Sequence, residues 1–151
     1  MIISNSIETR VFDALERPSE LQKREIVDFL HHHLQEYGDP KEHILKCLNF
    51  AVKETTSFGG FVIVSYDKQT VTGAVIVNRT GMGGYIPENI LVYIATHQEY
   101  RGQGIGKKLM EETLSFAKGD IALHVEQNNP AKKLYEKFGF TNPYLEMRLK
   151  R

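Results

Sequence analysis

The chain lacks the features that mark secreted, membrane-spanning and nucleic-acid-binding proteins. Its 151 residues contain one cysteine, Cys47, which excludes an internal disulfide framework and makes a reducing, cytoplasmic setting the default expectation. The longest apolar run, from Ile90 to Ala95, has six residues, whereas a membrane-spanning helix needs about 20. The sequence does not open on a basic stretch followed by an apolar one, so we expect no secretory signal and no membrane partner.

An excess of one charge is also missing. The 19 lysines and arginines balance 19 aspartates and glutamates, which argues against a nucleic-acid-binding surface. The balance is uneven along the chain, because residues 1–100 hold 9 basic and 13 acidic side chains, and residues 101–151 hold 10 and 6. The basic C-terminal part suits a polyanionic cofactor.

Hydrophobic periodicity predicts a mixed α/β fold in one domain, residues 1–151, with six to seven strands and about four helices. Ser19 is predicted to cap the first helix, and Asp39 followed by Pro40 is predicted to begin the second. The predicted strands are 9–14, 61–66, 70–77, 89–96, 121–125 and 144–150. The predicted helices run from 19 to about 37, from 40 to before 57, from 107 to 118 and from near 130 to before 139.

A glycine-rich turn joins the predicted strand 89–96 to the predicted helix 107–118. Backbone N–H groups at such a helix N-terminus lack partners within the helix, and with the helix dipole they form a site that suits a pyrophosphate. The turn fits neither the dinucleotide fingerprint G-x-G-x-x-G nor the Walker loop G-x-x-x-x-G-K-[ST]. It fits the pattern R-x-x-G-x-G, with Arg101, Gly104 and Gly106.

A second motif covers residues 128–140, which match the pattern N-x-P-A-x-x-L-Y-x-x-x-G-F. In this order and spacing, the two motifs resemble those of the GNAT superfamily of N-acetyltransferases. The resemblance covers roughly residues 60 to 150. It implies the GNAT fold and acetyl-CoA as the cofactor.

The resemblance implies a cofactor site made by the turn, the strand before it and the second motif. The amides of the turn would hold the CoA pyrophosphate, and Arg101 would either shape the turn or pair with a phosphate. Strand 89–96 would splay from strand 121–125, so that the pantetheine arm inserts between them. Asn128 would bond the pantetheine or, alternatively, cap the next helix. The implied cofactor-binding residues are Ile94, Ala95, Thr96, Arg101, Gly102, Gln103, Gly104, Ile105, Gly106, Lys107, Asn128 and Tyr135.

The resemblance also implies a general acid but leaves the general base open. Tyr135 matches the tyrosine that protonates the departing CoA sulfur in many relatives; the alternative is that its ring only packs in the core. Many relatives place a glutamate at the position where this chain has Ile90. Glu88 would share a strand face with Ile90 and act directly or through a water; the alternative is an exposed loop carboxylate. His97, His124 and Glu126 are further candidates, each more readily explained as structural or exposed.

The resemblance places the acceptor pocket between the first two helices and the loop before strand 89–96. Tyr37, Asp39 and Glu88 are the candidate acceptor-binding residues, and the loop from Gly81 to Tyr85 is a candidate lid. Adjacent residues on a helix point about 100° apart, so the histidines 31–33 cannot converge on one ion and we expect no metal. Cys47 has no evident histidine partner, which argues against an acetyl-cysteine intermediate.

These observations predict an acetyl-CoA-dependent N-acetyltransferase that passes the acetyl group directly to a primary amine in a ternary complex. The acceptor, a small molecule or a peptide or protein amine, stays open, although the acidic first 100 residues weakly favour a cationic one. A non-catalytic module that binds and senses acyl-CoA is the alternative, and Ile90 favours it. O-acyl transfer and longer acyl donors also stay open, and the segment 144–150 could pair across a homodimer interface.

Overall fold

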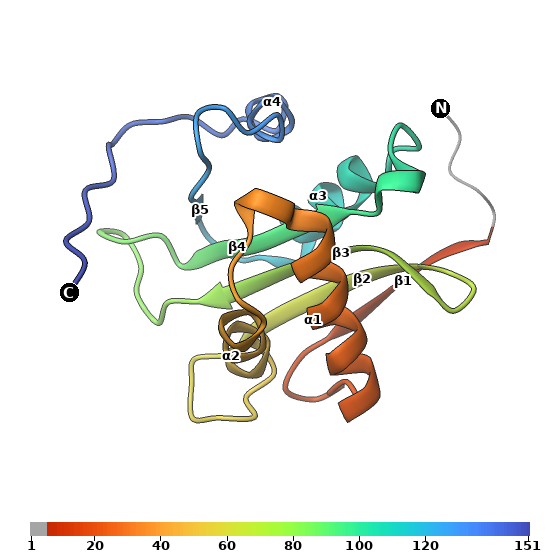
Figure 1. The fold of residues 1–151 in the computed structure, drawn as a ribbon. Helices are drawn as coiled ribbons and strands as arrows, with labels where there is room; N and C mark the ends of the chain where they lie inside the picture. Colours follow the sequence, from red (N-terminus) through yellow and green to blue (C-terminus); the bar gives the residue numbers. More distant parts are fainter. Residues whose placement is uncertain (1–5) are drawn as a thin grey trace.

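The computed structural model describes residues 6–151, which form one five-stranded sheet with helices on both faces (Figure 1). The strands lie in the sheet in chain order; β1 to β4 are antiparallel neighbours, and β5 runs parallel to β4. They are β1 (Ile7–Phe12), β2 (Gly60–Asp67), β3 (Thr70–Arg79), β4 (Asn89–Thr96) and β5 (Ile121–Leu123). The helices are α1 (Glu20–Leu34), η1 (Gln35–Tyr37), α2 (Lys41–Ala51), η2 (Gln98–Tyr100), α3 (Ile105–Phe116) and α4 (Lys132–Lys137).

The two central strands, β2 and β3, are apolar on both faces because helices cover both faces. Side chains alternate along a strand, so Val62 and Val64 join the core beneath α1 and α2, while Phe61 and Ile63 join the core beneath α3. Figure 1 shows α1 and α2 on one side of the sheet and α3 on the other. No helix within residues 6–151 is long and apolar enough to cross a membrane.

The prediction of the first helix cap is confirmed, and that of the second is wrong. Ser19 and Gln22 form a reciprocal capping box at the start of α1. Asp39 was expected to cap α2, but the capping position is taken by Pro40, which has no side-chain hydrogen bond to offer. The Asp39 carboxylate instead accepts a hydrogen bond from the hydroxyl of Tyr93 on β4.

The predicted six to seven strands are too many, because the described residues contain five. The segment 144–150 alternates in hydropathy as a strand does, yet it pairs with no strand, and Tyr144, Leu145 and Met147 are exposed. Alternation alone does not make a strand, since a strand also needs a neighbour for its backbone hydrogen bonds. The other predicted elements are present, with ends shifted by a few residues.

Candidate active site

The pairing of β4 with β5 breaks off halfway along β4. Asn89 to Leu91 pair with Ile121 to Leu123, and the remaining part of β4, Val92 to Thr96, has no partner in β5. The two strands therefore splay, as the resemblance implied. A strand that loses its neighbour leaves backbone N–H and C=O groups along that edge free to bond a ligand.

A β-bulge lies at the same point of β4. Leu91 and Tyr93 pair with the adjacent residues Val77 and Ile76 of β3, so Val92 is an extra residue without a partner across the ladder. Bulges redirect the strand and its side chains, and they are frequent beside active sites. Here the bulge coincides with the start of the splay.

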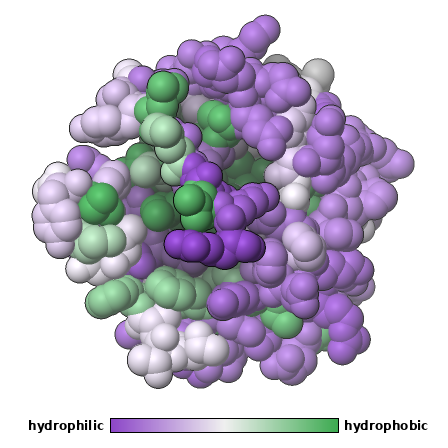
Figure 2. All heavy atoms as spheres, turned by 60° about the vertical axis from the view of Figure 1, so that its left-hand side comes forward, coloured by the Kyte–Doolittle hydropathy of each residue, from purple (hydrophilic) through white to green (hydrophobic). Residues whose placement is uncertain are grey.

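An open cleft runs from the splayed strands to the N-terminus of α3. Figure 2 shows the side of the molecule on the left of Figure 1, where hydrophobic side chains surround hollowed areas bordered by hydrophilic ones. The predicted site residues that line the cleft are Tyr37, Asp39, Ile94, Ala95, Thr96, Arg101, Gly102, Gly104, Ile105, Gly106 and Tyr135. Of the predicted residues, all within the described part of the chain, Glu88, Gln103, Lys107 and Asn128 lie outside this lining.

The turn before α3 has the backbone that its glycines allow. Gly102 and Gly104 have φ angles of 81° and 82°, in the left-handed region that L side chains rarely adopt. Gly104 is the N-cap of α3 and provides no side-chain cap, so the first N–H groups of the helix remain available to an anion. A Cβ atom at Gly102 would meet nothing within 4 Å, which leaves space for a phosphate beside the backbone.

Tyr135 on α4 is buried, with 7% of its surface exposed, and it lines the cleft. Burial raises the pKa of its phenol to about 12. The hydroxyl therefore stays protonated at neutral pH and can donate a proton to a stronger base beside it. The ring also packs edge-on against Phe140, with centroids 6.1 Å apart, so both expected roles of Tyr135 are compatible with its position.

The loop before α4 contacts the opposite wall of the cleft. The hydroxyl of Tyr37 in η1 donates to the carbonyl oxygen of Asn128, at 3.4 Å. The alternative role of Asn128 as a helix cap is wrong, because the N-cap of α4 is Ala131, which has no side-chain cap hydrogen bond. In the loop before the helix, Asn129 Oδ1 accepts a hydrogen bond from the N–H of Ala131 at 2.9 Å. Asn128 therefore joins two walls of the cleft through its backbone.

Glu88 lies at the other end of β4. Its Oε1 accepts a hydrogen bond from the N–H of Asp120 at 3.1 Å, and its side chain packs beside Gly119. The carboxylate thus ties the start of β4 to the start of β5. Its predicted role as general base stays a prediction.

Tyr93 is a cleft residue that sequence reasoning missed. It lies in the middle of β4, where an aromatic residue in an apolar run is expected to be core, and only 8% of it is exposed. Its hydroxyl reaches Asp39 Oδ2 at 2.5 Å, and burial together with this carboxylate raises the pKa of the phenol. The sequence signal for its place in the cleft is its hydroxyl, the one polar side-chain atom in the apolar run from Ile90 to Ala95.

Two of the three histidines of α1 make ring contacts, His32 with His33 and His33 with His97. His33 packs against His97, with centroids 4.3 Å apart, and burial, together with the neighbouring His97, lowers the pKa of His33 to about 4. Within residues 6–151, no three His, Cys, Asp or Glu side chains lie close enough together to hold a metal ion.

Cys47 is buried and accepts a hydrogen bond from Asn78, and burial raises the pKa of its thiol to about 12, so it is no ready nucleophile.

The comparison with known families agrees with this geometry. Residues 58–142, more than half of the chain, match the family model described as the acetyltransferase (GNAT) domain. The chain belongs to the GNAT family. Within that family, it is 34% identical over 85 residues to N-alpha-acetyltransferase 30 of Schizosaccharomyces pombe, an alignment that covers 53% of this chain and 57% of that protein.

A second curated relative is the 5-NmdU N-acetyltransferase of Pseudomonas phage PaMx11, 39% identical over 57 residues. That alignment covers 36% of this GNAT chain and 41% of the phage protein, so the chain spans about half the length of the curated relatives it matches.

Solved structures show the same fold across nearly the whole chain. A GNAT-family acetyltransferase from Streptococcus pneumoniae TIGR4 superposes with a TM-score of 0.69 at 18% identity, covering 96% of this chain and 98% of that one. An aminoglycoside acetyltransferase from an uncultured soil sample, in complex with sisomicin, has a TM-score of 0.63 at 16% identity, covering 97% and 96%. At these identities the likeness establishes the fold alone.

Proposed function

We propose that this GNAT chain is an N-acetyltransferase that moves the acetyl group of acetyl-CoA to a primary amine by direct attack in a ternary complex. The observation that supports it best is that the unpaired edge of β4 and the glycine turn before α3 adjoin in one cleft. The splayed edge of Val92 to Thr96 continues into the glycine turn at Gly102 to Gly106, with Tyr135 in the same cleft.

The cleft residues fit acetyl-CoA, which when bound supplies an acetyl group activated as a thioester. The exposed amides at the start of α3 would hold the pyrophosphate, and Arg101 at the cleft wall would add a positive charge beside it. The unpaired edge of Ile94, Ala95 and Thr96 would bond the amides of the pantetheine arm, as a neighbouring strand would.

In the proposed acetyl transfer, each residue acts at a particular atom. The acceptor amine loses a proton, its nitrogen bonds to the acetyl carbon, and the bond from that carbon to sulfur breaks. A backbone N–H near the bulge at Val92 would bond the carbonyl oxygen as it gains negative charge. Tyr135 would give its phenolic proton to the departing sulfur. We propose that Glu88 takes the amine proton through a water, since its carboxylate lies outside the cleft lining.

A non-catalytic acyl-CoA sensor is the second candidate, and Ile90 favours it. This residue occupies the position at which many relatives carry the glutamate base, and it cannot accept a proton. A sensor would bind acetyl-CoA in the same cleft and turn over no acceptor.

The test is to incubate the full chain with acetyl-CoA and a pool of amines, peptides and aminoglycosides, and to identify acetylated products by mass spectrometry. We expect a product whose kcat falls by about 100-fold or more in Tyr135→Phe, the range for loss of a general acid. The dissociation constant for acetyl-CoA, measured by calorimetry, should hardly change in that variant.

Tyr66→Phe is the matched control, because Tyr66 lies on β2 away from the cleft and loses the same hydroxyl. Glu88→Gln in the same assay tests the base, and full activity in that variant would remove Glu88 from the mechanism. Acetyl-CoA binding without any product would favour the sensor, and absence of binding would reject both functions.

A further inference from the structure

We propose that Asp39, held in place by Tyr93, binds a positive charge of the acceptor that is separate from the reacting amine. The chain would then select acceptors with at least two cationic groups. This inference rests on the function proposed above, since it concerns the acceptor side of the same cleft.

The first argument is the way the carboxylate is held. Asp39 lies between η1 and α2, and the hydroxyl of Tyr93 reaches it from β4, at 2.5 Å from Oδ2. Tyr93 is buried on rigid β4, next to the bulge, so it fixes the carboxylate against the strand along which we place the acetyl group. The backbone is held as well, because a ring nitrogen of His31 lies 3.3 Å from the Asp39 carbonyl oxygen.

The second argument is the missing cation. Among residues 6–151, no lysine, arginine or histidine forms an ion pair with Asp39. The lysine nearest in sequence, Lys41, turns away and pairs with Asp28 on α1 at 3.0 Å. A carboxylate that lines a cleft, fixed by a neutral partner and left without a cation, is suited to a cation that arrives with a ligand.

The surrounding charge has the same sign. Partial burial raises the pKa of the Tyr37 hydroxyl, and the negative charges of Glu36 and Glu126 raise it further. These two carboxylates therefore lie near Tyr37, and they favour a positive charge in this part of the cleft. Lysine and arginine side chains also line the cleft, namely Arg101, Lys132 and Arg148, and Arg101 lies in the turn before α3 that we propose to bind the phosphates.

The third argument is the chemistry of the two acceptor amines. A group that binds Asp39 through its charge must stay charged throughout the reaction. An alkyl ammonium, whose ordinary pKa is about 10.4, keeps its charge at neutral pH, whereas the reacting amine must lose its proton.

The test uses matched acceptor pairs in which one member has a second cation and the other a neutral group in its place. The pairs are diaminobutane against aminobutanol, and peptides with lysine against norleucine at the second position. We expect the wild type to acetylate the doubly cationic member with a kcat/KM about 10- to 100-fold higher, as a charge-assisted hydrogen bond allows. In Asp39→Asn that ratio should fall to near one, and in Tyr93→Phe it should fall part of the way.

Glu42→Gln is the matched control, since it removes the same charge in the first turn of α2, outside the cleft. Its ratio should equal that of the wild type. A wild-type ratio near one, or a ratio that Asp39→Asn leaves unchanged, would overturn the inference while acetylation itself proceeds. Acetylation of no acceptor at all would instead reject the proposed function, so the two failures are distinguishable.

Discussion

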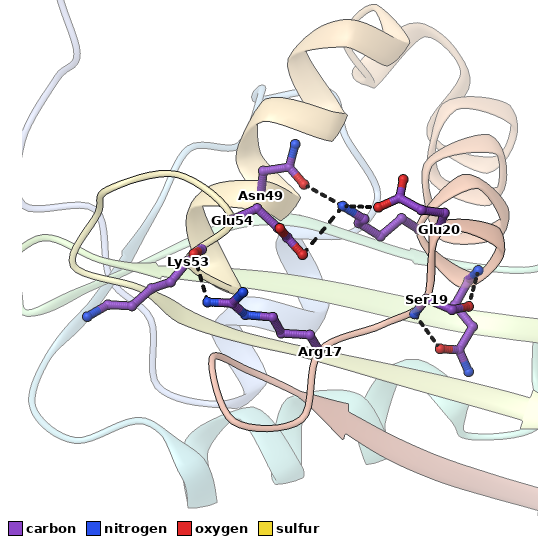
Figure 3. Close-up of polar contacts among 8 residues, drawn as sticks. Arg17, Ser19, Glu20, Asn49, Lys53 and Glu54 are labelled. Carbon is purple, nitrogen blue, oxygen red and sulfur yellow. Dashed lines mark hydrogen bonds and ion pairs between the residues drawn. The ribbon is translucent and has the colours of Figure 1, made fainter.

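The polar side chains near the two ends of α1 differ in how completely they are paired. Near its N-terminus, the Lys23 side chain is only 7% exposed, and its ammonium lies 3.0 Å from Glu20, 3.7 Å from Glu54 and 3.3 Å from Asn49 (Figure 3). Arg17 adds a hydrogen bond to the carbonyl oxygen of Lys53. The Lys23 ammonium and the Arg17 guanidinium both have partners, which come from α1, α2 and the loop after α2.

At the other end of the helix, the polar groups are less completely paired within residues 6–151. The Nδ1 atom of His33 is buried, and no other described residue hydrogen-bonds to it. Asp39 accepts a hydrogen bond from a hydroxyl, but no cationic side chain of the described residues pairs with it, and Tyr37 bonds at 3.4 Å to the far wall of the cleft. Both residues line the cleft, as His33 does.

The difference indicates that one end of α1 serves the packing of the fold and the other end serves ligand binding. Paired polar groups fix how α1 packs on α2, and this scaffold costs little to bury because its hydrogen bonds are satisfied. Unpaired groups are tolerated where a ligand completes them, since each one otherwise lowers stability. Substitutions at the first end should therefore change stability and leave ligand binding intact, and substitutions at the second end should do the reverse.

The largest expected effect is at Lys23. Lys23→Ala removes a buried cation with its aliphatic stem, and we expect the free energy of unfolding to fall by about 2 to 3 kcal/mol. The loss stays below the full cost of breaking a buried pair because Glu20 is 85% exposed and Glu54 33%, so water can solvate both carboxylates. Urea unfolding measures the change.

Lys23→Met is the control, since it keeps the stem and removes only the charge. Its expected cost is about 1 kcal/mol or less, as for other replacements of a buried ion pair by an apolar residue. The comparison between the two ends would break if either variant weakened acetyl-CoA binding or altered the choice of acceptor while stability held.

A smaller effect is expected from His33 and depends on pH. Burial, together with the nearby His97, His32 and Arg101, lowers the folded-state pKa of His33 from 6.5 to about 4. Between these values the unfolded chain binds the proton more readily, so the contribution of His33 to stability is present above pH 6.5 and is lost as the pH falls toward 4. Because the ring is partly exposed, solvent screening reduces this contribution to about 1 kcal/mol.

Urea unfolding of the wild type and of His33→Phe, at about pH 7 and about pH 5, tests this expectation. The wild type should lose about 1 kcal/mol more than the variant over that interval. Equal losses would mean that His33 titrates in the folded protein as it does in the unfolded chain, and that this end of α1 is as well solvated as free solution.

The paired end of α1 was more predictable from the sequence than the open end. Ser19 and Gln22 are three residues apart, and the capping box that they form depends on local geometry alone. The limits of β4 and the glycine turn were likewise predictable, because apolar periodicity and positive-φ residues are local signals.

The open end depends on contacts that are distant in sequence. Asp39 has the residue type and position of a helix cap, but its carboxylate instead accepts a hydrogen bond from Tyr93, which is 54 residues away. Residues 144–150 have the alternation of a strand without a neighbouring strand, and the splay of β4 from β5 was expected only by resemblance. Each of these outcomes follows from which partner lies nearby in space, and periodicity carries no information about that.

The smallest effect on stability, and the sharpest test of the comparison, is expected from Tyr37→Phe. The hydrogen bond that it removes is long and exposed, so the free energy of unfolding should change by less than about 0.5 kcal/mol. The same hydroxyl connects η1 to the loop at Asn128 across the cleft, and its loss should loosen the acceptor side. We expect the KM for the acceptor to rise by about three- to tenfold, the equivalent of one weak hydrogen bond, with an unchanged dissociation constant for acetyl-CoA. A stability loss like that of Lys23→Ala, with the KM unaltered, would instead make both ends of α1 scaffold and would move the acceptor site elsewhere in the cleft.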